Sequence, residues 1–307
     1  MDAPSTLQPA EVAAALIQQA VAKHNTRYDK TFFKAVLAGV MLSFGGLLAL
    51  IITGGSPSLN SANPGLVKIL GGFVFPVGLA MYDARTISHR LYVTIHYRIV
   101  LQGFDLLTSN LMIFPMAVLK GALPWWSVPV NWIIVTFGNL AGSLFFAALL
   151  AKDDGLIVSE PYVTYIRNFA VSKAVTPAWY QIFLRGIGCN WLVCIAIWQG
   201  AGARETVSKV VAIWFPIWIF VACGFDHVVA NMFSLPLGIM LHADLTTVYY
   251  IKKSLVASYL GNIVGGLLVG LPALYFHLCD NKTEELTTAE EGRVDRKRSD
   301  DSTSSGQ

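Results

Sequence analysis

The chain carries one phrase twice: residues 103–112 read GFDLLTSNLM, and residues 224–233 read GFDHVVANMF. Each copy places an aspartate and an asparagine in a stretch that is otherwise apolar enough to lie in a membrane. A carboxylate at bilayer depth is costly and is typical of an ion or substrate path. Polar interruptions at corresponding points of two halves indicate a transporter built from repeats, whose broken helices meet near the membrane midplane.

The repeat extends beyond the phrase. A Phe-Pro pair at 75–76 and at 215–216 precedes each copy, and a Gly-Asn pair at 138–139 and at 261–262 follows each copy. The phrases are 121 residues apart and the Gly-Asn pairs are 123 residues apart, so the offset is nearly constant there. The distance from proline to phrase is 27 residues in the first half but 8 in the second. The first half therefore contains an additional segment.

Composition also indicates a membrane protein, because 54% of the 307 residues are hydrophobic, 13% are charged and the mean hydropathy is +0.55. We expect six transmembrane crossings, at 34–53, 68–119 (interrupted), 131–151, 181–200, 210–241 (interrupted) and 255–278. Three crossings per half would insert the second half upside down. The predicted fold is an all-α integral membrane protein with two inverted three-helix repeats, whose second and fifth helices are broken.

The expected organisation is a cytoplasmic segment over residues 1–30, a transport domain over 31–278 and a disordered cytoplasmic tail over 279–307. Basic residues before the first span favour a cytoplasmic N-terminus, whereas Lys252 and Lys253 favour the opposite orientation. A net charge of +3 without a basic stripe indicates no nucleic-acid partner. No spacing of His, Cys or carboxylates suits a metal, a cofactor or a catalytic nucleophile, so we do not expect an enzyme.

His227 is the outstanding candidate site residue, because it follows Asp226 where the first copy has Leu106. Its imidazole can donate a hydrogen bond when neutral and a proton when charged, which suits the anion of a weak acid. The alternative is a core histidine with satisfied hydrogen bonds. Thr108 is the first-half candidate to face it.

Asp105 and Asp226 are interpreted as caps that accept from freed backbone N–H groups of the second half-helices, with proton relays as the alternative. Asn110 and Asn231 would line the centre or satisfy the opened backbone.

These stretches, together with FVFPVGLA at 73–80, FGNLAGSLFFA at 137–147 and RGIGCNWLVCIAIW at 185–198, resemble the formate/nitrite transporter family over residues 33–275. The resemblance implies a homopentamer of aquaporin-like protomers, each with its own pore for small monovalent anions. It implies that His227 is the pore histidine, opposite Thr108. It also places along the pathway Asn190, the apolar constriction residues Phe75, Leu79 and Leu107 on one side of the centre, Phe220 on the other side, and Lys173 near the mouth.

The expected function is transport of nitrite, because a eukaryotic member of such a family would serve nitrate assimilation, and the pore histidine would allow proton coupling. Formate or another short monocarboxylate is the alternative substrate. A water or glycerol facilitator is the alternative of another class, although both phrases lack its Asn-Pro-Ala motif. The expected location is the plasma membrane.

Residues 82–98 do not suit the second span, since they place Asp83, Arg85, Arg90 and Arg98 at membrane depth. Each charge costs about 2.5–3.5 kcal/mol at a helix centre on insertion scales. Deleting this segment reduces the distance from Pro76 to the first phrase from 27 residues to 10. We interpret the segment as a translated intron, with a real surface loop as the alternative.

Overall fold

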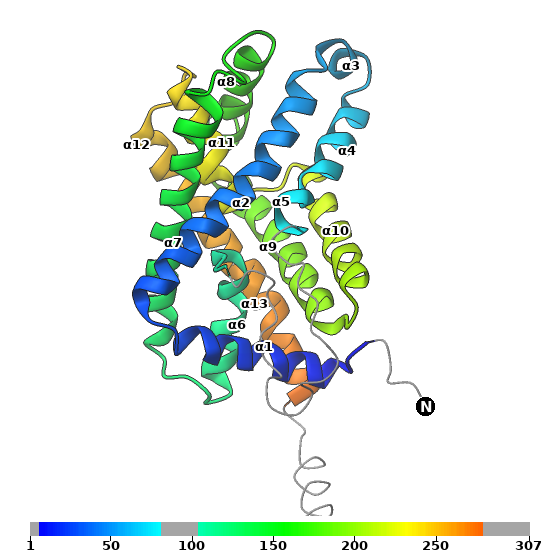
Figure 1. Ribbon diagram of the computed structural model, residues 1–307, viewed down its shortest axis with the longest axis vertical. Coiled ribbons are helices and arrows are strands. Elements are labelled where there is room, and N and C mark those ends of the chain that lie inside the picture. Colours follow the sequence, from blue (N-terminus) through cyan, green and yellow to red (C-terminus); the bar gives the residue numbers. More distant parts are fainter. Residues whose placement is uncertain (1–5, 81–103, 279–307) are drawn as a thin grey trace, which may run out of the picture.

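The computed structural model describes residues 6–80 and 104–278, the side chains of Leu79 and Ala80 excepted, and these residues form helices without any strand (Figure 1). The first half contains α1 (Pro9–His24), α2 (Tyr28–Gly54), α3 (Pro57–Ala62), α4 (Pro64–Val74), α5 (Pro76–Ala80), α6 (Leu107–Leu119), α7 (Ser127–Phe145) and the π-helix η2 (Phe146–Lys152). The second half contains α8 (Tyr162–Ala174), α9 (Trp179–Gly202), α10 (Thr206–Cys223), α11 (Val228–Met240), α12 (Thr247–Tyr249), the π-helix η3 (Tyr250–Leu255) and α13 (Val256–Leu278).

The chain is a multi-pass membrane protein, as its composition predicts. Five helical stretches of the described part are long and apolar enough to cross a membrane: Tyr28–Gly54, Ser127–Lys152, Trp179–Gly202, Thr206–Cys223 and Thr247–Leu278. Three shorter apolar helices accompany them, over Pro64–Gly78, Leu107–Leu119 and Val228–Met240. The division into six crossings stays a prediction, since the suspected insertion at 82–98 lies outside the described residues, as does the tail at 279–307.

The break after α10 is formed by four residues, and its first residue explains why the helix stops there. Gly224 has φ 75°, in the left-handed region that favours glycine, and α11 begins at Val228. In the first half, α6 begins at Leu107. Each of these 13-residue helices is about 20 Å long, too short to cross a bilayer. Ten residues of each are buried, so both half-helices begin and run inside the bundle.

Two long helix pairs surround these half-helices, and each pair packs at very short distance. A Cβ at Gly142 of α7 would meet the carbonyl oxygen of Val36 in α2. The corresponding contact in the second half joins Gly265 of α13 to the carbonyl oxygen of Ile187 in α9. Glycine at these positions lets the backbones touch, which is a common packing device in membranes.

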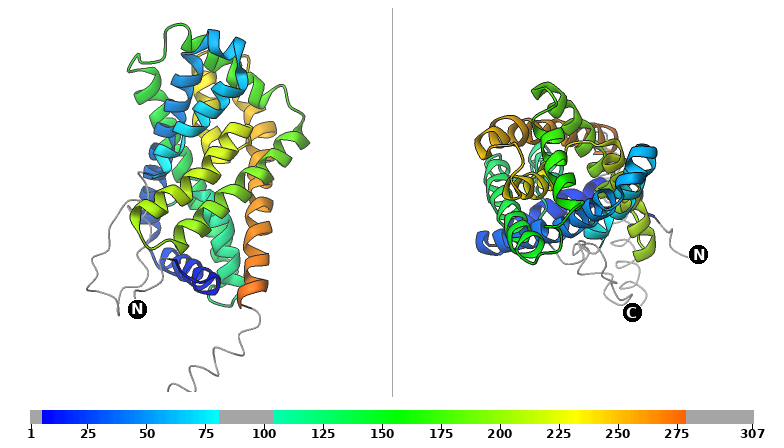
Figure 2. Two further views of the ribbon diagram at one scale, coloured as in Figure 1. Left: turned by 90° about the vertical axis from the view of Figure 1, so that its right-hand side faces the viewer. Right: turned by 90° about the horizontal axis from the view of Figure 1, so that it is seen from above.

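Helix α1 was not predicted, because residues 1–30 were expected only as a cytoplasmic segment. It lies across one end of the bundle, whereas α8 and α12 lie at the other end (Figures 1 and 2). Its apolar face packs against α6, α9 and α13. The buried residues of that face are Val12, Ala13, Leu16, Ile17 and Ala20.

Candidate functional site

The two half-helices begin next to an asparagine from a neighbouring long helix. The N–H of Leu107 donates to Asn139 Oδ1 at 2.9 Å, and the N–H of Val228 donates to Asn262 Oδ1 at 3.0 Å. Each asparagine also donates from Nδ2 to the carbonyl oxygen of the aspartate in the broken phrase, at 2.9 Å in both halves. These amides belong to the repeated Gly-Asn pairs, which sequence reasoning noticed as repeat marks without assigning them a role.

The capping role predicted for Asp105 and Asp226 is therefore wrong. The N-caps are Leu106, which makes no side-chain cap, and His227. Each carboxylate instead forms an ion pair with a lysine: Asp105 Oδ1 with Lys23 Nζ at 2.8 Å, and Asp226 Oδ1 with Lys173 Nζ at 3.2 Å. A buried carboxylate is stabilised more by a cation than by a neutral N–H group, so each aspartate pairs with a lysine. The neutral amides of the two asparagines accept from the helix N–H groups instead.

Asn110 and Asn231 lie on the first turns of the half-helices and donate back to the same carboxylates. Asn110 Nδ2 donates to Asp105 Oδ1 at 3.0 Å, and Asn231 Nδ2 donates to Asp226 Oδ1 at 3.3 Å. Asn110 also donates to Asn131 Oδ1 at 2.8 Å. Both asparagines thus satisfy polar groups at the breaks.

The two lysines come from opposite ends of the bundle, because α1 carries Lys23 and α8 carries Lys173 (Figure 1). Lys173 also donates to the carbonyl oxygens of Gly224 at 2.6 Å and Phe225 at 3.0 Å. Lys23 donates to the side-chain oxygen of Asn110 at 2.6 Å. Sequence reasoning used Lys23 only as a topology signal. The available clue was its place ahead of the first span, which matches that of Lys173 ahead of α9.

His227 and Thr108 lie together where α6 and α11 begin. His227 is 2% exposed, and its Nε2 is 3.2 Å from Thr108 Oγ1. Its Nδ1 accepts from the N–H of Ala230 at 3.0 Å, so the side chain caps α11. Because Nδ1 is an acceptor, the neutral ring carries its proton on Nε2, which points toward Thr108.

Asn190 joins this pair from α9. Its Nδ2 donates to the carbonyl oxygen of Thr108 at 3.2 Å and to that of Asn262 at 2.7 Å. The two acceptors fix the orientation of the amide. Asn190 Oδ1 is then a buried acceptor with no hydrogen-bond partner among the described residues.

Aromatic rings cover one side of the histidine. The ring of Phe220 stacks on His227 with centroids 5.6 Å apart and planes 15° apart. Phe75 contacts Phe220 edge to face at 5.9 Å. The expectation that Phe75 and Phe220 lie on opposite sides of the centre is wrong, since α10 packs directly against α4 and α5. Leu107 is fully buried beside Thr108, whereas Leu79 lies in α5 with its side chain outside the described set.

Comparisons with family profiles, with sequences and with solved structures all indicate the same protein family. A profile described as "Formate/nitrite transporter" matches residues 10–82 and 85–276, with its gap inside the suspected insertion. A "Probable formate transporter" from Methanothermobacter thermautotrophicus is 34% identical over 88% of this chain and 96% of its own length. Two solved structures are similar. A "Pentameric formate channel with formate bound" has a TM-score of 0.66 at 27% identity, covering 82% of this chain and 98% of its own. An "FNT family ion channel" has a TM-score of 0.70 at 26% identity, covering 87% and 97%.

Proposed function

The chain belongs to the formate/nitrite transporter family, and we propose that it moves a small monovalent anion past His227 together with a proton. The observation that carries this proposal is the contact of His227 Nε2 with Thr108 Oγ1 at the start of two buried half-helices. An imidazole N–H and a hydroxyl are donors that suit an anionic oxygen. The N-termini of α6 and α11 add positive potential at the same place.

The proton is proposed because of the cost of removing water from an anion. Phe75, Phe220 and Leu107 offer no hydrogen bonds, and an unpaired charge among apolar groups is very unfavourable. Adding a proton from the aqueous side to an oxygen of the anion yields the neutral weak acid, which crosses such a constriction at far lower cost. The proton and the anion then separate again in water on the far side.

Asn190 supports passage of the neutral acid. Its Oδ1 is a buried acceptor with no partner among the described residues, and its Nδ2 ties the amide to the carbonyl oxygen of Thr108, the residue whose hydroxyl contacts His227. A carboxylic or nitrous acid presents one O–H donor beside an acceptor oxygen, so it complements this set. An anion would leave Asn190 Oδ1 unsatisfied, which is unfavourable in a buried site.

The electrostatic design at the two ends fits an anion that can move in either direction. Lys23 and Lys173 stand near opposite ends of the bundle, each bonded to the aspartate of a broken phrase. Because each lysine is paired with a carboxylate, the two ends carry matched ion pairs, and neither end favours one direction of passage.

Nitrite remains our preferred substrate, with formate as the rival that the relatives' names favour. Both are planar anions with two oxygens, and the residues around His227 offer no contact that separates them. Uptake of labelled nitrite by cells that make the protein, with formate as competitor, tests the proposal. Uptake of neither anion above that of control cells would refute it.

We further propose that the protein is a homopentamer in the plasma membrane. The support is its similarity to a protein described as a pentameric formate channel. Large apolar side chains exposed on the outer helices need either lipid or a second protomer to cover them, among them Phe73, Phe137, Phe215, Leu268 and Phe276.

A further inference from the structure

The side chain of Asn262 holds the second break at three points. Its Oδ1 accepts from the N–H of Val228 at 3.0 Å, and its Nδ2 donates to the carbonyl oxygens of Asp226 and Gly186, each at 2.9 Å. Asp226 and Val228 flank His227, and Gly186 belongs to α9. The backbone on both sides of the histidine is therefore joined to α9 through one buried amide of α13. We call these three bonds an amide clamp.

Asn139 forms the same amide clamp in the first half. Its Oδ1 accepts from the N–H of Leu107 at 2.9 Å, and its Nδ2 donates to the carbonyl oxygens of Asp105 at 2.9 Å and Ala35 at 2.8 Å. Its side chain is also fully buried. The two clamps are thus matched in their hydrogen bonds and in their burial.

Asn190 extends the second clamp to the first half. Its Nδ2 donates to the main-chain oxygen of Asn262 at 2.7 Å and to that of Thr108 at 3.2 Å. Asn262 is thus joined to the backbone around His227 through its own side chain, and to Thr108 through Asn190. Both members of the central pair depend on the place of this one residue.

The first clamp has no such link among the described residues. The acceptors on the long helices are Ala35 for the first clamp and Gly186 for the second, and they are 151 residues apart. The same offset places Gly39 at the position of Asn190. Glycine has no side chain that could form the link, and a Cβ there would meet the carbonyl oxygen of Asn139. The two clamps are equal locally but differ in what they join.

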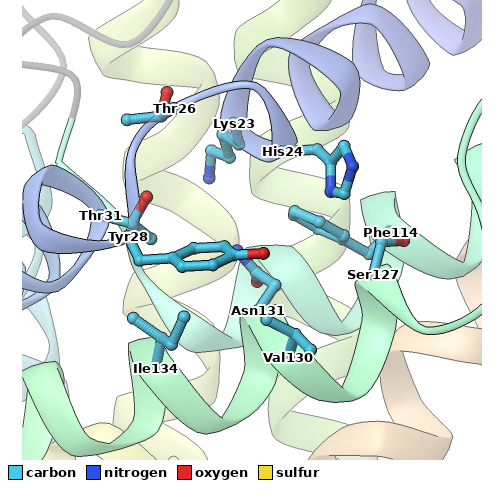
Figure 3. Close-up of a pocket in the computed structure, with 10 residues that line it drawn as sticks. All are labelled: Lys23, His24, Thr26, Tyr28, Thr31, Phe114, Ser127, Val130, Asn131 and Ile134. Carbon is cyan, nitrogen blue, oxygen red and sulfur yellow. The ribbon is translucent and has the colours of Figure 1, made fainter.

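The first half-helix has a further attachment of its own. Asn110, on its first turn, accepts from Lys23 of α1 at 2.6 Å and donates to Asn131 of α7 at 2.8 Å. Lys23 and Asn131 both line the small space between the end of α1 and α7 (Figure 3). Thr108 lies two residues before Asn110, so α6 stays attached near Thr108 even without the clamp of Asn139.

We propose that Asn262 is a positioning residue, which sets the distance between His227 and Thr108. That distance is 3.2 Å, at the upper limit of the usual range for a hydrogen bond, so a small shift of either backbone breaks the contact. Loss of the clamp would free the backbone around His227 from α9, whereas Asn190 would continue to hold Thr108. The positioning role concerns this contact, and its effect on transport rests on the proposed function.

Structures of two variants, determined by electron cryomicroscopy, test the positioning role without transport. Asn262→Ala removes the second clamp, so His227 Nε2 and Thr108 Oγ1 should separate beyond about 4 Å. Asn139→Ala is the matched control, because it removes the same three bonds from an equally buried site but leaves Thr108 attached. The contact should persist in that variant. A contact that survives in Asn262→Ala, or one that is lost equally in both variants, would overturn the proposal.

Formate uptake by proteoliposomes tests what the positioning does for transport. Asn262→Ala should lower the maximal rate about tenfold, because the contact is lost. Added to Thr108→Val, which already lacks the contact, it should lower the rate no further, whereas a merely structural role would multiply the two losses. Ser258→Ala is the control, since Ser258 is equally buried one turn earlier on α13 and donates only to carbonyl oxygens of the preceding turn.

Multiplied losses in the double variant would overturn the proposal, as would an equal loss in the Ser258 control. The distances in the variant structures decide the positioning role even if the unchanged protein carries no formate. A failure of this inference is thereby distinguishable from a failure of the proposed function.

A further substitution covers the case in which Asn262→Ala does not fold. Gly266→Ala keeps every hydrogen-bonding side chain, but its Cβ would lie 3.1 Å from Asn190 Nδ2 and 3.2 Å from the carbonyl oxygen of Leu111 in α6. It should displace the link and lower the maximal rate roughly three- to tenfold. Gly270→Ala is the matched control one turn later, because its Cβ would press on flexible methionine side chains of α6. Equal rates in these two variants would overturn the proposal.

Discussion

Replacing Lys173 by methionine would leave a buried carboxylate without its cation. Asp226 is fully buried, its Oδ1 is 3.2 Å from Lys173 Nζ, and its Oδ2 has no partner among the described residues. Removing one partner of a buried ion pair costs about 3–5 kcal/mol. Because the lysine side chain is 14% exposed, water can reach the site and we expect about 3 kcal/mol. With an unfolding entropy of about 2.1 cal/mol/K per residue, that corresponds to a fall of roughly 5 °C in Tm for a chain of this size.

The assay is thermal unfolding of the purified protein in one detergent, with a second substitution to isolate the charge. Lys173→Met with Asp226→Asn removes both charges and keeps an oxygen for Asn231, so most of the lost Tm should return. Lys152→Met is the control, because Lys152 forms an exposed pair at 3.5 Å with Asp153 that should contribute less than about 1 kcal/mol. If Tm falls by the same amount in the single and double variants, the lysine stabilises the protein through the carbonyl oxygens it contacts, and our reasoning about the charge is wrong.

Three further predictions concern the pathway and the suspected insertion. His227→Phe should lower uptake at least tenfold at every pH while the protein stays folded, because the N–H donor at the centre is lost; uptake equal to that of the unchanged protein would show that His227 has no such role. Thr108→Val should lower uptake about tenfold through the loss of one hydrogen bond, whereas Thr108→Ser should keep uptake close to that of the unchanged protein. Equal uptake in both variants would show that transport does not need the hydroxyl. Deleting residues 82–98 should leave uptake at or above that of the full chain. Gly78 and Asp105 both contact α2, at points about 10 Å apart along its axis, and the residues left between them after the deletion can span that distance. Sequencing the mature transcript is the companion test, and codons for 82–98 in the dominant message would refute the intron.

The half-helix at the second break could be predicted because its signal is local. Gly224, the first residue of the second phrase, stands in an apolar stretch and ends α10, and its positive φ shows why glycine is found there. The contact between Thr108 and His227 could also be predicted from the sequence repeat, because broken helices at matching points of two inverted repeats meet at the centre.

The partners of the aspartates could not be predicted because they are distant in the sequence. An aspartate ahead of a helix usually indicates a cap. Here Asp105 stands two residues before α6, and the amide of Asn139 already satisfies the first N–H of that helix. The cation comes from Lys23 on α1, and only the three-dimensional packing of α1 under α6 brings it there.

The assignment of Phe75 and Phe220 to separate constrictions failed for a related reason. Sequence order places them in different halves, but α4 and α10 pack side by side and bring the rings into edge-to-face contact. Helix α1 was not predicted, although its apolar residues recur at helical spacing, because the helix has 16 residues and is too short to give the signal of a membrane span.

The central claim is that the anion passes His227 as the neutral weak acid. The most direct test is to measure formate and proton fluxes together in proteoliposomes under an imposed membrane potential, with protein-free liposomes as control. We predict a proton for every formate and a rate that the potential does not change. Formate flux that rises with the potential and carries no protons would contradict the account.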